Sequence, residues 1–209
     1  MISKIIGGRL SHIIKWTALI MLFMPSYILG QIPPGDSKIN PVTFFKEFIT
    51  VSLSDSEANI EGIYYFRNNQ SSGQLFRVFF PFYLDSLTLF PHEIAAFKKN
   101  GKHLDKLAYM ATHNAVRFSV PLNADTVTVW SLQYSQNLRS KSAIYILKSA
   151  QTWRKPLEEA HFMVNVPRNF KNVKIWPEPD SSRVDAGRVY YFCTERNFMP
   201  ERDLEINWE

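Results

Sequence analysis

Short segments in which apolar and polar residues alternate follow one another along most of the chain. In one segment Ile60, Tyr64 and Phe66 share a phase, and in the next every second residue from Phe76 to Phe82 is aromatic or aliphatic. A period of two residues indicates a β-strand with one buried face. The pattern predicts strands at residues 45–53, 59–67, 75–83, 93–98, 107–111, 115–120, 125–134, 142–149, 162–166, 173–176, 188–194 and 204–208.

Turn residues between these segments suggest how the strands connect. The loop 68–73 is rich in Asn, Ser and Gly and is predicted to join the strands on either side as a hairpin, while Pro81 marks an edge strand or a bend. Within the longest segment the apolar phase shifts between Val129 and Trp130, which predicts a β-bulge. Residues 156–160 are predicted to make one helical turn.

About ten short strands with almost no 3.6-residue period predict an all-β protein. We expect an antiparallel β-sandwich, immunoglobulin-like or related, because crossover helices for a parallel sheet are missing from the pattern. One domain is expected at residues 42–209. A sub-boundary near residue 150 is also considered, with residues 151–209 adding strands, a small C-terminal layer or a second lobe.

The start of the chain has the pattern of an export signal. Three basic residues and no acidic one precede an apolar run at 16–29, which is shorter than the roughly 20 residues of a membrane span. We therefore predict a signal peptide at 1–30 and a Pro-rich leader at 31–41. The alternative is an uncleaved membrane anchor. Both place the domain outside the cytoplasm, in the periplasm, on the cell surface or secreted.

Charge argues against a nucleic-acid surface. The chain has 24 basic and 19 acidic residues, a net charge of +5, but the region after residue 30 holds 21 and 19, a net charge of +2, with no long run of like charges. The single cysteine, Cys193, excludes an intrachain disulfide. Its phase with Val189 and Tyr191 predicts a buried side chain, and the alternative is a nucleophilic thiol with His161 as its base.

No pattern in the sequence assigns a catalytic residue, a cofactor or a metal ligand. Asp55, Glu57, Asn59 and Glu61 alternate like calcium-loop ligands, but Ile60 stands where an EF-hand loop needs glycine, so we interpret them as the solvated face of a strand. The histidines lack the short spacings of metal sites, and no Gly-x-Ser-x-Gly motif occurs.

Apolar residues on both faces of one strand give the candidate binding surface. Ile63 and Tyr65 lie opposite Tyr64 and Phe66, so this strand is apolar on both sides. Such a strand is either covered by two layers or carries an exposed apolar patch that can bind a partner. Ile63 and Tyr65 are therefore the candidate site residues.

Three stretches, Gly62–Asn69, Phe79–Phe82 and Tyr145–Ala160, resemble uncharacterised bacterial exported β-sandwich proteins. This resemblance implies the fold and the exported location, and it transfers no functional residue. We expect an exported or envelope-associated binding module whose partner is a protein or another envelope component. The alternatives are a carbohydrate-binding or carbohydrate-acting domain and a structural subunit of an envelope assembly. Membrane contact is expected only if the N-terminal segment stays uncleaved.

Overall fold

The computed structural model describes residues 41–209, which contain fourteen strands and one short 3-10 helix. No helix in this part of the chain is long and apolar enough to span a membrane. The predicted signal peptide and nearly all of the leader lie outside the described residues. The elements are β1 (Val42–Leu53), β2 (Glu57–Asn68), β3 (Gln74–Pro81), β4 (His92–Asn100), β5 (His103–Leu107), β6 (Tyr109–Ala111), β7 (Ala115–Leu122), β8 (Thr126–Asn137), β9 (Ser142–Tyr145), η1 (Lys148–Trp153), β10 (Leu157–Pro167), β11 (Lys174–Trp176), β12 (Ser181–Asp185), β13 (Arg188–Phe198) and β14 (Leu204–Asn207).

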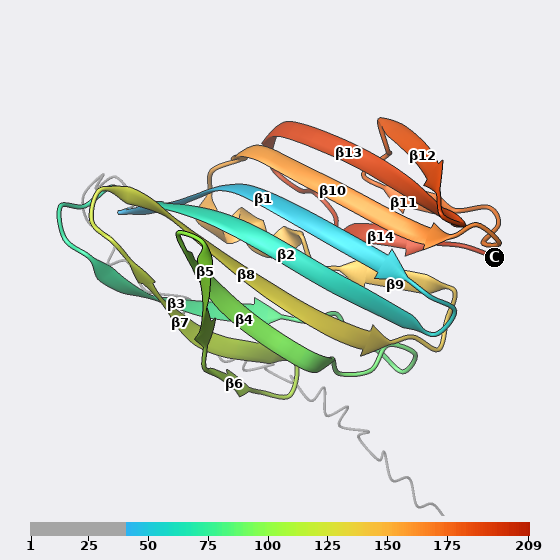
Figure 1. Ribbon diagram of the computed structural model, residues 1–209, viewed down its shortest axis with the longest axis horizontal. Coiled ribbons are helices and arrows are strands. Elements are labelled where there is room, and N and C mark those ends of the chain that lie inside the picture. Colours follow the sequence, from blue (N-terminus) through green and yellow to red (C-terminus); the bar gives the residue numbers. More distant parts are fainter. Residues whose placement is uncertain (1–40) are drawn as a thin grey trace, which may run out of the picture. The chain divides into compact units, whose positions relative to one another are not determined.

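The strands form one large sheet and two small ones (Figure 1). The large sheet has eight strands in the order β12-β13-β10-β1-β2-β8-β4-β5, and the small sheets have the orders β11-β14-β9 and β3-β7-β6. Both small sheets contribute buried side chains to the same core as the large sheet. The predicted all-β sandwich is confirmed, although it has fourteen strands rather than about ten.

The connections differ from the expected ones in three places. β2 pairs with β1 and β8, whereas β3 pairs with β7, so the predicted hairpin is wrong and the loop after Asn68 carries the chain from the large sheet to a small one. β1 and β10 are parallel neighbours. The chain between them runs through β2 to β9 and the short η1 rather than through a crossover helix. The predicted helical turn at 156–160 belongs to β10, and the only 3-10 helix of the described chain is Lys148–Trp153.

The predicted bulge in β8 is also wrong. β2 and β8 pair without a break over twelve residues, from Glu57 opposite Asn137 to Asn68 opposite Thr126. Trp130 lies on the buried face of β8, whereas Val127 is 42% exposed on the other face. The apparent change of phase therefore reflects apolar residues on the outward face of a regular strand. The bulges lie instead in β1, between Phe44 and Lys46, and in β4.

A layer of aromatic rings joins the large sheet to the β3-β7-β6 sheet. The Tyr64 and Trp130 rings of neighbouring strands stack at 4.2 Å between centroids. Phe118 of β7 meets Trp130 edge-on at 5.3 Å, and Phe80 of β3 meets Tyr64 edge-on at 6.0 Å. Stacked and edge-on pairs of this kind stabilise by about 0.5–1.5 kcal/mol each beyond the area that they bury. The inner face of the large sheet is thus fixed against its cover.

Gly62 lets one of these rings reach the second small sheet. A Cβ at this position would lie 2.0 Å from the Tyr64 hydroxyl, so any larger residue would displace the ring. In its observed place the Tyr64 hydroxyl is 2.7 Å from that of Tyr145 in β9, in a buried hydrogen bond. The glycine inside a long strand is therefore explained by close packing.

Glu47 is an acidic side chain buried in this core. It lies in β1 opposite Tyr64, only 3% exposed, and its Oε1 has no hydrogen-bond partner. Burial raises the pKa of Glu47 from 4.5 to about 8, because the charged form is poorly solvated there. The folded protein therefore holds a proton on Glu47 at neutral pH that the unfolded chain releases.

This difference predicts how stability changes with pH. Between pH 4.5 and 8 the folded state binds more protons than the unfolded one, so Glu47 lowers the free energy of unfolding as the pH rises, by at most about 4–5 kcal/mol. Glu47→Gln should remove this contribution and be more stable than the wild type at pH 8.5, with a smaller difference at pH 5. Urea unfolding of Glu47→Gln and the wild type at pH 5 and at pH 8.5 measures this difference in stability. The exposed Glu61→Gln is the matched control, and an equal pH dependence in Glu47→Gln and wild type would contradict the assignment.

Candidate functional site

One face of the eight-stranded sheet is left open by the described residues. The two small sheets pack on its inner side, and no other described element crosses the front of the sheet in Figure 1. We call this side the outer face. Alternate residues of each strand point to it, and the strand register sets them in rows across the sheet. The outer face is therefore where side chains outside the core are brought together.

The structure places both predicted site residues on the outer face. Ile63 and Tyr65 are half-buried on β2. Ile63 pairs with Phe48 of β1 and Ser131 of β8, and the Tyr65 ring lies 5.9 Å from the Phe48 ring. The strand that looked apolar on both sides is thus covered on its inner side only. Ile63 and Tyr65 lie with the rings of Phe45 and Phe48 in the middle of the outer face, and we call these four residues the aromatic strip.

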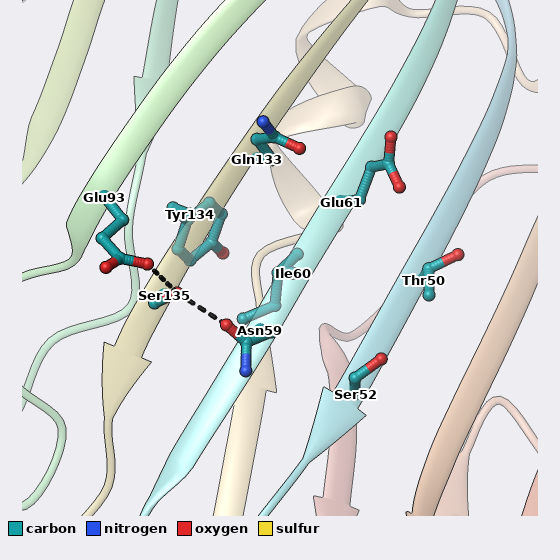
Figure 2. Close-up of a pocket in the computed structure, with 9 residues that line it drawn as sticks. All are labelled: Thr50, Ser52, Asn59, Ile60, Glu61, Glu93, Gln133, Tyr134 and Ser135. Carbon is teal, nitrogen blue, oxygen red and sulfur yellow. Dashed lines mark hydrogen bonds between the residues drawn. The ribbon is translucent and has the colours of Figure 1, made fainter.

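Next to this strip, the same face is hollowed over a volume of about 360 Å³. Figure 2 shows that polar side chains from four adjacent strands surround the hollow. Register puts Glu61 between Thr50 and Gln133, and one row further Asn59 between Ser52 and Ser135. The lining residues are Thr50 and Ser52 of β1, Asn59, Ile60 and Glu61 of β2, Gln133, Tyr134 and Ser135 of β8, and Glu93 of β4.

Glu93 enters the hollow through a break in the ladder. The pairing of β4 with β8 shifts between His92 and Ala95, and Glu93 there has a φ of 53°. This left-handed backbone is costly for a residue with a Cβ, typically by about 1–3 kcal/mol. Bulges re-aim side chains in this way. The strained backbone directs the Glu93 carboxylate toward Ser135, as Figure 2 shows.

Hydrogen bonds leave oxygen acceptors free in the hollow. The Ser135 hydroxyl lies 2.6 Å from Asn59 Oδ1 and 3.4 Å from Glu93 Oε2. Since a hydroxyl has one proton, it donates to the nearer oxygen and leaves the Glu93 carboxylate available. The Glu61 carboxylate makes no hydrogen bond or ion pair with another residue of 41–209. The hollow can therefore accept hydrogen bonds from hydroxyl or amino groups of a ligand.

The acidic residues do not form a metal site in the described chain. β2 begins at Glu57, so Glu57, Asn59 and Glu61 follow one another along a strand, about 7 Å apart, rather than around a loop. Residues 41–209 contain no group of three or more His, Cys, Asp or Glu placed to hold a metal. Glu57 instead pairs with His92, Oε1 to Nε2 at 3.2 Å, at the rim of the hollow.

A ladder of charged and polar side chains crosses the other end of the outer face. Glu159 of β10 lies between Lys46 of β1 and His161, whose Nε2 is 3.2 Å from Glu159 Oε2. Hydrogen bonds from Lys46 and His161 lower the pKa of Glu159 to about 2. The His161 ring stacks on Phe48 at 4.4 Å and its Nδ1 is 3.2 Å from Thr194 Oγ1. The ladder therefore packs against the Phe48 ring of the aromatic strip.

The cysteine cannot use His161 as its base. Cys193 is 4% exposed and pairs with Phe162 on the inner face, whereas His161 pairs with Thr194 on the outer face. Burial raises the pKa of the Cys193 thiol to about 12. The predicted burial of Cys193 is confirmed, and the thiol–imidazole alternative is wrong because the two side chains lie on opposite sides of the sheet.

Comparison with known proteins identifies the fold and no family. No protein-family model and no curated protein matches the sequence. Among solved structures, the chain is similar to a "putative nutrient binding protein" from Legionella pneumophila, with a TM-score of 0.62 and 12% identity, covering 79% of this chain and 66% of that one. It is also similar to an M1 zinc metallopeptidase from Deinococcus radiodurans, with a TM-score of 0.50 and 10% identity, covering 81% and 43%. The chain thus spans less than half the length of that peptidase.

Sequence reasoning found part of this site. The alternation of Asn59 and Glu61 with apolar residues showed a solvated strand face, and Ile63 and Tyr65 continue it. Glu93 was missed because a bulge in β4 depends on its register with β8, which leaves no local pattern. The alternation of Ser131, Gln133 and Ser135 was the signal that could have placed β8 beside the hollow.

The strain at Glu93 yields a prediction on stability. Glu93→Gly should raise the free energy of unfolding by about 1 kcal/mol, because glycine adopts a positive φ without steric cost. Glu93→Ala removes the same carboxylate and keeps the strained backbone, so it should give no gain. Denaturant unfolding of the two variants compares them directly. Equal stabilities would show that the backbone at residue 93 stores no strain.

Proposed function

We propose that this protein is an exported, non-enzymatic binding module that takes its ligand on the outer face of the eight-stranded sheet. The observation that carries the proposal is Glu93, held in a strained conformation by a bulge and directed into an open hollow. Among residues 41–209 six non-glycine residues have a positive φ, and of these six only Glu93 lines the hollow. Strain of this kind gathers at ligand-contacting positions.

The chemistry of the outer face defines the ligand that fits it. Glu61 and Glu93 offer carboxylate oxygens, and Gln133 offers an amide, so the hollow suits groups that donate hydrogen bonds. The aromatic strip around Ile63 and Tyr65 adjoins the hollow along β2 and offers an apolar contact. A protein or envelope component that presents hydroxyl or amino groups beside an apolar surface would contact both parts.

The likeness to solved structures agrees with a binding role. The Legionella protein of similar fold is named a "putative nutrient binding protein", and a binding role for this chain agrees with that name. Export rests on the basic and apolar pattern of the first thirty residues. A module on the outside of the cell meets envelope components and imported compounds first.

A pull-down with residues 31–209 as bait, from an envelope extract of the producing cell, tests the protein-binding form of the proposal. We expect to retain a partner whose affinity for the bait falls at least about tenfold in Ile63→Glu and in Tyr65→Glu. The reason is that a charge buried in an apolar contact costs more than about 1.4 kcal/mol. Val184→Glu, at a 57% exposed position on edge strand β12, is the matched control. A partner retained equally by all variants would exclude the outer face.

Carbohydrate is the second candidate ligand, because rings and carboxylates share this face. Phe48 lies one row and Tyr65 two rows from Glu61, which lines the hollow together with Glu93. Sugars combine an apolar ring face with donating hydroxyls. We expect Glu93→Gln and Tyr65→Ala to weaken retention on immobilised envelope polysaccharide, while Val184→Ser leaves it unchanged. If wild type binds no polysaccharide and sediments as a self-associated species, the structural-subunit alternative is favoured instead.

A further inference from the structure

Among residues 41–209, the β3-β7-β6 sheet has a second open surface, on the side away from the core. Strand register sets Phe79, Arg117 and Met110 side by side in one row across the three strands. The following rows place Arg77 beside Ser119 and Leu75 beside Pro121. The alternate residues of β3 and β7 point inward and are buried, including Val78, Phe80, Val116, Phe118 and Val120. We call the seven outward residues the basic-apolar face: Leu75, Arg77, Phe79, Met110, Arg117, Ser119 and Pro121.

This face exposes large apolar side chains. Leu75 is 63% exposed, Met110 67% and Phe79 36%. At the edge of the same sheet Tyr109 is 39% exposed. Contiguous apolar side chains on a surface mark contacts with proteins or membranes, whereas single ones need no explanation. Here apolar residues from three strands lie in two rows, with Arg77 and Ser119 between them, so a mixed apolar and basic contact surface is indicated.

The charge of the face is positive and uncompensated. Arg77 and Arg117 lie on it, and neither takes part in any ion pair among residues 41–209. The Arg117 guanidinium lies 5.4 Å from the centre of the Phe79 ring. The seven outward residues include two arginines and no carboxylate. A negatively charged partner is therefore favoured.

We propose that the basic-apolar face docks on an anionic lipid bilayer. Apolar side chains interleaved with arginines suit the bilayer interface, where methyl and aromatic groups enter the acyl boundary and guanidinium groups meet phosphates. A stable protein interface takes about 20–30 residues from each side, whereas this face offers seven. Lipid binding has no such minimum, because each inserted side chain and each cation adds to it. This contact acts whether or not the N-terminal segment is removed.

Vesicle sedimentation of residues 31–209, which include the whole described core, tests the proposal. The probes are vesicles of phosphatidylcholine alone and of equal parts phosphatidylcholine and phosphatidylglycerol. We expect binding to the anionic vesicles only, weakened by salt. Arg77→Glu with Arg117→Glu should reduce it at least about tenfold, since each surface cation contributes about 1 kcal/mol. Arg183→Glu on β12 is the control and should bind as wild type.

A second measurement separates docking from a loss of folding. Leu75→Cys can be labelled selectively with a polarity-sensitive dye, because Cys193 is buried. Anionic vesicles should shift the emission of this label to the blue, and a label at Val184→Cys should not respond. The proposal is overturned if wild type does not bind anionic vesicles, if the arginine variants bind as wild type, or if only the Val184 label responds. Retention on an acidic protein without vesicle binding would overturn it too, in favour of a protein partner.

Discussion

The aromatic layer under the large sheet decides which surfaces the protein can use. Tyr64, Trp130 and Phe118 lock the inner face of the eight strands against β7, and Tyr145 ties it to the second small sheet. Because successive side chains of a strand point to opposite faces, every other side chain of the large sheet is turned outward, where no described element covers it. The buried contacts lie on one side of the sheet, and the other side is left open by the described residues.

Aromatic rings on the open outer face are partly covered by long charged side chains. The ammonium group of Lys46 lies 5.0 Å from the centre of the Phe48 ring, and the guanidinium of Arg67 lies 4.3 Å from that of Phe45. Cations over rings gain attraction and cover apolar surface at once. At the hollow the lining is polar instead, and the carboxylates of Glu61 and Glu93 face solvent.

Alternation along the sequence predicted where strands lie and which way they face, because a period of two depends on burial alone. Residues 59–67 and 115–120 became β2 and β7 with their apolar sides inward. It could not predict partners, since pairing depends on contacts distant in sequence. For that reason β2 and β3 were joined in a hairpin that does not exist, and the parallel pairing of β1 with β10 was missed.

The same limit explains which part of the candidate site was foreseen. Ile63 and Tyr65 could be named because two-sided apolarity is a property of one strand. Glu93 could not, because its orientation results from a mismatch between β4 and β8 that only their register reveals. Its positive φ is one of six at non-glycine residues among 41–209, and of these six only Glu93 lines the hollow. The proposed binding role therefore rests on a strained side chain that points into an open polar hollow, an arrangement that only the three-dimensional structure reveals.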